Sequence, residues 1–154
     1  MKFVIANWKM NLSVEESIAL AKEYLRVFRE TPAEVVACPS FTSLPFVGKI
    51  LGDSAISVGA QDVFWEASGA FTGEVSAGDL RDLGAGYVIV GHSERRGMGE
   101  TDWMINRKIH TILNTEPLCP ILCIGERSDD RVTGQLEAVL SRQLTEALAG
   151  VELK

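Results

Sequence analysis

The sequence predicts an α/β fold in which parallel β-strands are covered by helices. Strand and helix patterns alternate five times along the 154 residues, in units of about thirty residues each. In the fourth predicted strand, residues 87–91, the first four residues are β-branched or aromatic with no charge on either face, which is typical of a parallel strand buried on both sides. The hydrophobic fraction of 46% is enough for one sizeable core. Because no linker interrupts the pattern, residues 1–154 are predicted to form a single domain.

The first two units each pair an apolar strand with a helix whose start is marked in the sequence. Ser13 and Glu16 form a capping box, and apolar residues then recur at steps of three and four to about Glu30. Ser43 is predicted to cap the second helix, which Gly52 closes. The elements predicted here are strands at residues 2–8 and 34–38 and helices at residues 13–30 and 43–51.

The remaining three units follow the same order. A long polar loop, residues 61–75, separates the third strand from a short helix capped by Ser76. Thr101 is predicted to begin the helix after the fourth strand. The elements predicted here are strands at residues 55–60, 87–91 and 120–125 and helices at residues 76–83, 101–113 and 132–148. Two architectures fit this order, an open doubly wound sheet and part of a (β/α)8 barrel.

Charge and cysteine usage exclude several classes of function. The net charge is −6 and no basic tract is present, which argues against nucleic-acid or anionic-membrane partners. No apolar run reaches the length of a signal peptide or a membrane span. Cys38, Cys119 and Cys123 are predicted to be reduced, buried thiols of a cytoplasmic protein. Two thiols without a histidine pair do not indicate a metal site, and we expect no metal or cofactor.

His92 follows the fourth strand at its carboxyl end, where parallel α/β folds bind their ligands. Residues 93–96 are predicted to form a short helical turn, and a helix N-terminus disfavours imidazolium. Taken alone, a histidine at a strand end is more often structural than catalytic, and a single lysine such as Lys9 is more often solvated. Only a joint pattern of motifs reverses these expectations.

Four motifs form such a pattern, each at or after the carboxyl end of a predicted strand. They are Asn-Trp-Lys-Met-Asn at 7–11, Gly-Ala-Phe-Thr-Gly-Glu at 69–74, Gly-His-Ser-Glu-Arg-Arg at 91–96 and Pro-Ile-Leu-Cys-Ile-Gly-Glu at 120–126. In this order they closely resemble the triosephosphate isomerase family. The resemblance implies a partial (β/α)8 TIM barrel, the first five of its eight units. It also implies the isomerisation of dihydroxyacetone phosphate and glyceraldehyde 3-phosphate by proton transfer through an enediolate.

The resemblance assigns roles to the residues that match these motifs. His92 is implied to be a neutral electrophile that polarises the substrate carbonyl. Lys9 would supply positive charge to the phosphate and the developing oxyanion, Asn7 would hold Lys9 and contact substrate, and Glu94 would pair with Lys9. Gln61 and Cys123 match supporting positions.

The resemblance also implies a homodimer. Phe71, Thr72 and Gly73 match the loop that enters the neighbouring subunit's active site. Glu74 and Arg95 match a supporting ion pair near that interface.

The five predicted units lack the catalytic base that the resemblance calls for. In the family it is a glutamate after the sixth strand, and the lid and phosphate-binding glycine turns lie in the last three units. Glu126 is a poor substitute by position. A complete barrel needs about 250 residues. Three alternatives therefore stay open: a second chain that completes the barrel, a truncated form of a normal enzyme, and an inactive, self-associating half-barrel that acts as a scaffold or binding protein.

Overall fold

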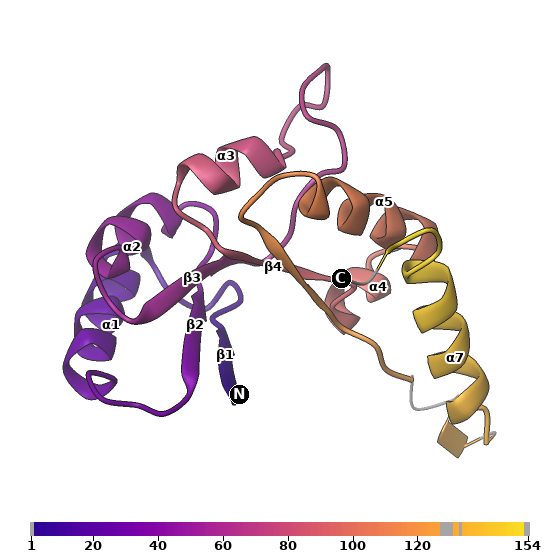
Figure 1. Cartoon of the computed structure of the whole chain (residues 1–154), viewed down its shortest axis with the longest axis horizontal. Helices are drawn as coiled ribbons and strands as arrows, with labels where there is room; N and C mark the ends of the chain where they lie inside the picture. Colours follow the sequence, from indigo (N-terminus) through magenta and orange to yellow (C-terminus); the bar gives the residue numbers. More distant parts are fainter. Residues whose placement is uncertain (1, 127–130, 133, 153–154) are drawn as a thin grey trace.

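Five parallel strands form one sheet whose order follows the chain, β1-β2-β3-β4-β5 (Figure 1). The structure is a computed structural model that describes residues 2–126, 131–132 and 134–152. Each strand pairs in parallel with the next one along the sequence. The predicted α/β class is therefore confirmed. The strands are β1 Phe3–Asn7, β2 Glu34–Cys38, β3 Ile56–Ala60, β4 Tyr87–Val90 and β5 Cys119–Leu122.

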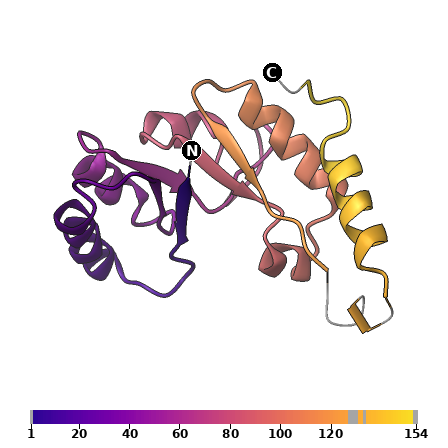
Figure 2. The same cartoon turned by 60° about the horizontal axis from the view of Figure 1, so that its bottom comes forward.

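Helices cover one face of this sheet, as Figures 1 and 2 show. These helices are α1 Val14–Val27, α2 Leu44–Leu51, α3 Ala77–Asp82, α5 Asp102–Leu113 and α7 Leu136–Ala147, whereas α4 Ser93–Gly97 lies at the carboxyl end of β4. The short helix α4 follows β4 directly, as the sequence predicted. Helix α7 packs on α5, where the Asn106 side chain donates hydrogen bonds of 3.0 Å to the carbonyls of Ala147 and Ala149.

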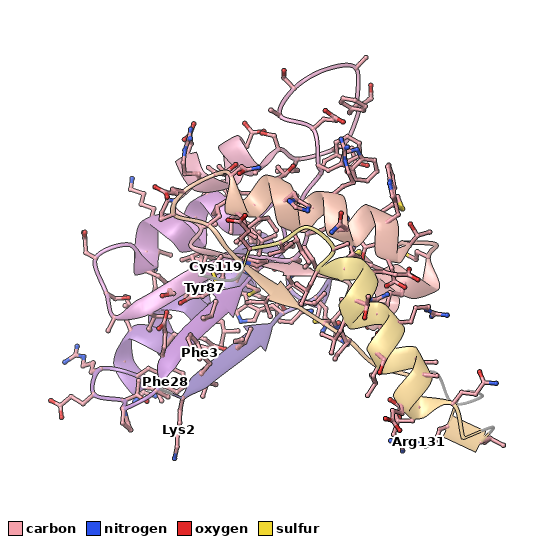
Figure 3. All side chains as sticks on the ribbon, turned by 45° about the vertical axis from the view of Figure 1, so that its right-hand side comes forward. Lys2, Phe3, Phe28, Tyr87, Cys119 and Arg131 are labelled. Atoms are coloured by element: carbon pink, nitrogen blue, oxygen red, sulfur yellow. The ribbon has the colours of Figure 1, made fainter. Side chains whose placement is uncertain are left out.

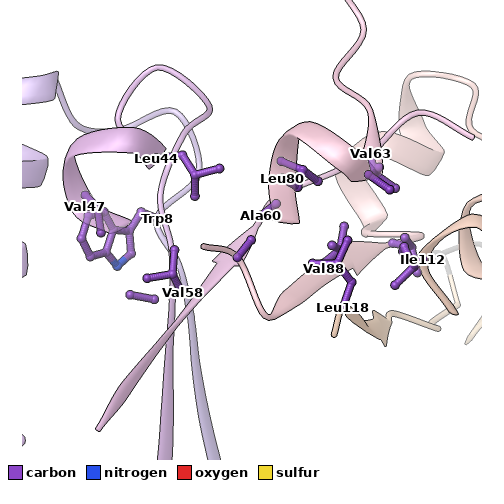
Figure 4. Packing of buried hydrophobic residues seen from close by; sticks show 14 of the residues in the cluster. Trp8, Leu44, Val47, Val58, Ala60, Val63, Leu80, Val88, Ile112 and Leu118 are labelled. Atoms are coloured by element: carbon purple, nitrogen blue, oxygen red, sulfur yellow. The ribbon is translucent and has the colours of Figure 1, made fainter. Parts of the chain in front are cut away.

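Alternate side chains of each strand face the helices and the opposite, concave side of the sheet. On β2, Val35 and Ala37 join the main core against the helices, whereas Val36 and Cys38 belong to a smaller apolar cluster on the concave side. The main core extends from α2 past α3 to α5 (Figure 4). Its buried members in that view include Trp8, Leu44, Val47, Val58, Ala60, Leu80, Val88, Ile112 and Leu118.

The sheet is curled, and a contact between non-neighbouring strands shows it. The ring of Phe3 on β1 meets the ring of Tyr87 on β4 edge to face, with centroids 6.2 Å apart. Since β2 and β3 lie between them, this contact spans the concave side (Figure 3). A doubly wound sheet would carry helices on that face as well. The arrangement is therefore part of a barrel, the second of the two predicted architectures.

Three predicted helix starts are confirmed and one predicted cap is wrong. Ser13, Ser76 and Thr101 each accept a backbone hydrogen bond as N-caps. Ser43 makes no capping bond with its side chain and has helical φ and ψ. Its carbonyl accepts from the Val47 amide at 3.0 Å, so Ser43 already follows the helical path.

Three further boundaries and two thiols differ from prediction. Helix α1 ends at Val27 rather than at about Glu30, and Cys123 is only partly buried. Helix α7 begins at Leu136 rather than at 132, because Gly134 adopts a φ of 70° that a right-handed helix does not tolerate; residue 133 of that predicted helix lies outside the described residues. The fifth strand runs from Cys119 to Leu122, shorter than predicted at its end. Cys119 is exposed rather than buried, because it lies on an edge strand. Within the described ranges, no helix is long and apolar enough to cross a bilayer.

Candidate active site

A cavity of about 490 Å³ lies at the carboxyl ends of the strands and gathers most of the predicted site residues. Asn7 and Lys9 reach it from the end of β1, and His92, Glu94 and Arg95 from the end of β4. Because parallel strands all end at one edge, residues more than eighty positions apart meet here. The rest of the lining is Met10, Ser40, Phe41, Gln61, Asp62 and Met98.

Lys9 is held in an unusual backbone conformation. Its φ is 54°, and among the described residues it is the one residue other than glycine in that region. Such strain persists only where the surroundings enforce it. The Lys9 amide donates to the Asn7 side-chain oxygen at 2.9 Å, and the Lys9 carbonyl accepts from the Gln61 amide at 2.9 Å. Asn7 thus holds the main chain of Lys9, and Gln61 secures it from the other side.

The Glu94 carboxylate bonds the lysine and lies beside the histidine. One carboxylate oxygen accepts a 2.8 Å hydrogen bond from the Lys9 ammonium, and the other oxygen lies 3.5 Å from Nδ1 of His92. The hydrogen bond from Lys9 lowers the pKa of the Glu94 carboxyl below its ordinary value. Both side chains of the Lys9–Glu94 pair are about half exposed, so solvent screens the pair and it contributes little to the stability of the fold. The pair orients the Lys9 ammonium in the cavity rather than stabilising the fold.

His92 is the N-cap residue of α4, and its ring is oriented by that helix. The Glu94 amide donates to Nδ1 of His92 at 3.3 Å. Since an amide can only donate, Nδ1 accepts, and the proton of a neutral ring is then on Nε2. A neutral imidazole of this tautomer can donate a hydrogen bond to a carbonyl oxygen. With five residues, α4 is too short for a large dipole. The tautomer of His92 is therefore inferred from the hydrogen bond of the Glu94 amide alone.

The loop predicted to reach a neighbouring subunit projects from the body of the protein (Figure 1). Phe71, Thr72, Gly73 and Glu74 are all exposed, although the Phe71 ring packs against Phe64 with centroids 4.7 Å apart. These residues do not line the cavity of their own chain.

Arg95 faces two acidic side chains of its own chain. It forms ion pairs with Asp62 at 2.8 Å and with Glu100 at 3.3 Å. Among the described residues Glu74 forms no ion pair, so its pairing with Arg95 stays a prediction.

A buried charge cluster beneath the cavity was missed by the sequence analysis. The Lys108 ammonium lies 2.6 Å from Asp62 and bonds Glu100 as well, and all three side chains are less than 10% exposed. The signal was available in the sequence. Lys108 lies on the apolar stripe of α5 that also carries Ile105 and Ile112, and a lysine in such a stripe requires a buried partner.

Of the three remaining residues that the sequence analysis singled out, one lines the cavity and two lie outside it. Gln61 lines the cavity, whereas Cys123 packs against Val36, Cys38 and Ile89 on the concave side. Glu126 lines a different cavity of about 670 Å³ and pairs with Arg131 at 2.8 Å. Across the described part of the chain, no group of three or more His, Cys, Asp or Glu side chains could hold a metal ion.

Comparison with known proteins agrees with the barrel geometry and points to one enzyme family. The family model for triosephosphate isomerase matches residues 2–154. The triosephosphate isomerases of Dictyoglomus thermophilum and Treponema pallidum are 45% identical over 153 residues and 46% identical over 150 residues. These matches cover 98% and 97% of this chain but 61% and 60% of the relatives.

A solved structure gives the same result for the fold. The crystal structure of triosephosphate isomerase from Bartonella henselae superimposes with a TM-score of 0.92 at 32% identity. That match covers 98% of this chain and 63% of the other. The chain thus spans about three fifths of the length of the proteins that it matches.

Proposed function

The chain belongs to the triosephosphate isomerase family, and from this premise we propose that it carries the carbonyl-polarising part of an aldose-ketose isomerase acting on triose phosphate. The observation that carries the proposal is the amide of Glu94 on Nδ1 of His92. With Nδ1 accepting this hydrogen bond, the proton of a neutral ring is on Nε2, where it can be donated in a hydrogen bond to a substrate carbonyl. His92 shares its cavity with Lys9, the cation that an anionic substrate requires.

The proposed reaction interconverts dihydroxyacetone phosphate and glyceraldehyde 3-phosphate. A base removes the proton from the carbon beside the carbonyl while His92 donates a hydrogen bond to the carbonyl oxygen. The enediolate that forms concentrates negative charge on oxygen, where His92 and Lys9 stabilise it. Asn7 fixes the main chain from which the Lys9 side chain extends and contributes to substrate binding.

We propose that the proton-abstracting carboxylate lies outside these 154 residues. Glu94 is engaged by Lys9, and Glu126 lines the other cavity. About two fifths of the length of the matched relatives lies outside the match with this chain, which is room for further β/α units with a base and phosphate-binding loops. Whether one polypeptide or two supply them, residues 1–154 act as one domain in this proposal.

The sheet edges support pairing with further strands. On β1, Phe3 and Val4 are each 49% exposed and Ile5 is 40% exposed. Exposed apolar edge strands pair readily with other strands. We propose that β1 and β5 pair with a complementing C-terminal half-barrel. The projecting loop Phe71–Glu74, together with Arg95, would form the interface of a homodimer; the free thiols are consistent with the cytoplasm.

Complementation tests this function directly. The chain is mixed or co-expressed with the last three β/α units of the Dictyoglomus thermophilum relative, and turnover of glyceraldehyde 3-phosphate is measured. We expect turnover, with His92→Ala lowering kcat by about 10²- to 10⁴-fold and Lys9→Met weakening substrate use severely. His110→Ala, which changes the second of the two histidines, is the matched control. Full turnover by the His92→Ala complex would sink the proposal.

The apolar edge of β1 also favours a second candidate, an inactive self-associating half-barrel. This scaffold predicts a defined oligomer of the chain alone, with cooperative unfolding and no turnover in any complemented form. Sedimentation velocity of the chain, with and without the complementing units, separates the two. Replacement of the oligomer by a one-to-one active complex excludes the scaffold.

A further inference from the structure

The peptide groups on both sides of Gly91 are held by charged side chains that follow it in the sequence. The Gly91 amide donates to Glu100 Oε2 at 3.1 Å, and the Gly91 carbonyl accepts from Nε of Arg96 at 2.8 Å. The last bond of the β4–β5 ladder is the Cys123 amide to the Val90 carbonyl, one residue earlier. The turn that presents His92 is therefore fixed by side chains rather than by the sheet.

Gly91 needs such support because its conformation is restricted from all sides. Its φ is 72°, and a Cβ at this position would meet the Cys123 carbonyl oxygen at 2.9 Å. The residue is also buried, so an unpaired amide here would remain without water as a partner. Glu100 supplies the partner that this amide has in the described structure.

Glu100 is itself fixed by two cations. Its other oxygen accepts from the Lys108 ammonium and lies 3.3 Å from Nε of Arg95. Asp62 bonds the same two cations, so two carboxylates face two cations and no charge of the cluster is left uncompensated. A fully satisfied buried network of this kind specifies one geometry.

We propose that Glu100 is a positioning residue for His92, acting through the Gly91 amide, with Lys108 as its buried counter-ion. The inference rests on the proposed function of His92 as the group that meets the substrate carbonyl. Glu100 does not line the cavity that holds His92, so it acts through the main chain. Without the Glu100 oxygen, the Gly91 turn would become more mobile, and the His92 imidazole would no longer be held in one orientation.

The test compares two double variants, Glu100→Gln/Lys108→Met and Glu100→Leu/Lys108→Met. Changing Lys108 in both avoids an unpaired buried ammonium, which would threaten folding. The glutamine still offers an oxygen to the Gly91 amide, whereas the leucine does not. Glu66→Gln/Arg107→Met removes a solvent-exposed ion pair between the loop after β3 and α5, the helix that carries Lys108, and serves as the matched control. Val47→Ala controls for a loss of stability alone.

The first measurement is nuclear magnetic resonance of the chain as it stands. His92 and His110 are the two histidines, so the ring ¹⁵N signals of His110 are an internal reference. We expect the leucine variant to shift the Nδ1 signal of His92 and to speed hydrogen exchange of the Gly91 amide at least about tenfold. The glutamine variant should restore both largely to wild type. Unchanged His92 signals in the leucine variant would overturn the proposal.

The second measurement is turnover in the complemented enzyme. Misplacing a reacting group by about 1 Å costs about 10²-fold, so we expect kcat to fall by about that factor in the leucine variant with little change in KM. Val47→Ala should leave kcat unchanged. If the wild-type complex shows no turnover, the proposed function fails while the resonance measurement still decides the positioning role. Equal kcat values for the leucine variant and wild type would refute the positioning role of Glu100.

Discussion

Gln61 donates a 2.9 Å hydrogen bond from its side-chain amide to the main-chain carbonyl of Lys9, across 52 positions of sequence. The same amide nitrogen donates to the carbonyl of Cys38, at the end of β2, also at 2.9 Å. One side chain on the β3 end thus joins the ends of β1 and β2. This bond secures the strained Lys9 backbone from the side opposite to Asn7.

Gln61→Met is therefore expected to destabilise the fold and to loosen Lys9. Two carbonyls lose a donor in a partly buried site, which costs about 1–3 kcal/mol in the free energy of unfolding. Urea denaturation measures the loss, and the backbone amide shift of Lys9 reports the loosening. Gln143→Met is the control, because Gln143 bridges the main chain of Gly125 in a similar way but away from the cavity. Equal perturbation of Lys9 by both variants would contradict the prediction.

The positive φ of Lys9 predicts an inversion of the usual preference for alanine over glycine. Lys9→Ala and Lys9→Gly both remove the ammonium, but only glycine accepts a φ of 54° without strain. We expect the glycine variant to be more stable than the alanine variant by about 1 kcal/mol. Lys49, an exposed residue of α2, should show the opposite order by a similar amount. Thermal or urea unfolding of the four variants decides the matter.

Lys9 should also control the titration of Glu94. Because the hydrogen bond from Lys9 lowers the pKa of Glu94, the carboxyl of the wild type should lose its proton below the ordinary value of about 4.3. Lys9→Met should raise that pKa back towards the ordinary value. Carboxyl ¹³C shifts followed against pH measure both. Glu16, whose pKa is lowered by its hydrogen bonds with Ser13, should titrate identically in the two proteins.

The fold and the cavity residues were accessible from sequence because their signals are local or belong to motifs. Periodicity and capping residues placed the strands and most helices, and the motif at 91–96 placed His92 and α4. The start of α7 was misplaced because the φ of Gly134 is a property of the folded chain. The apolar stripe of α5 could have indicated a buried Lys108, but its partners Asp62 and Glu100 could not be identified from sequence for a related reason. The members of this buried charge cluster are spread over 46 positions and are joined only by tertiary packing.

The last prediction concerns the concave side, where the Tyr87 hydroxyl donates a short hydrogen bond to the Glu34 carboxylate. That hydrogen bond, together with partial burial and the negative charge, raises the pKa of Tyr87 to about 12. A raised pKa means that the fold favours the neutral phenol. This contribution to stability is complete below about pH 10, the ordinary tyrosine value. It is lost as the pH rises through 12, because the unfolded chain gives up the proton first.

Glu34→Gln should therefore lower the pKa of Tyr87 towards 10 and flatten the fall in stability at alkaline pH. Ultraviolet titration at the phenolate band measures the pKa, with Tyr24 as the second tyrosine for reference. Glu30→Gln removes the same charge from the exposed turn before β2 and should leave Tyr87 as in the wild type. Since Phe3 of β1 packs against the Tyr87 ring, a charged phenolate would also weaken the contact that closes the curl of the sheet. An unchanged Tyr87 titration in Glu34→Gln would show that burial, not the carboxylate, sets its pKa.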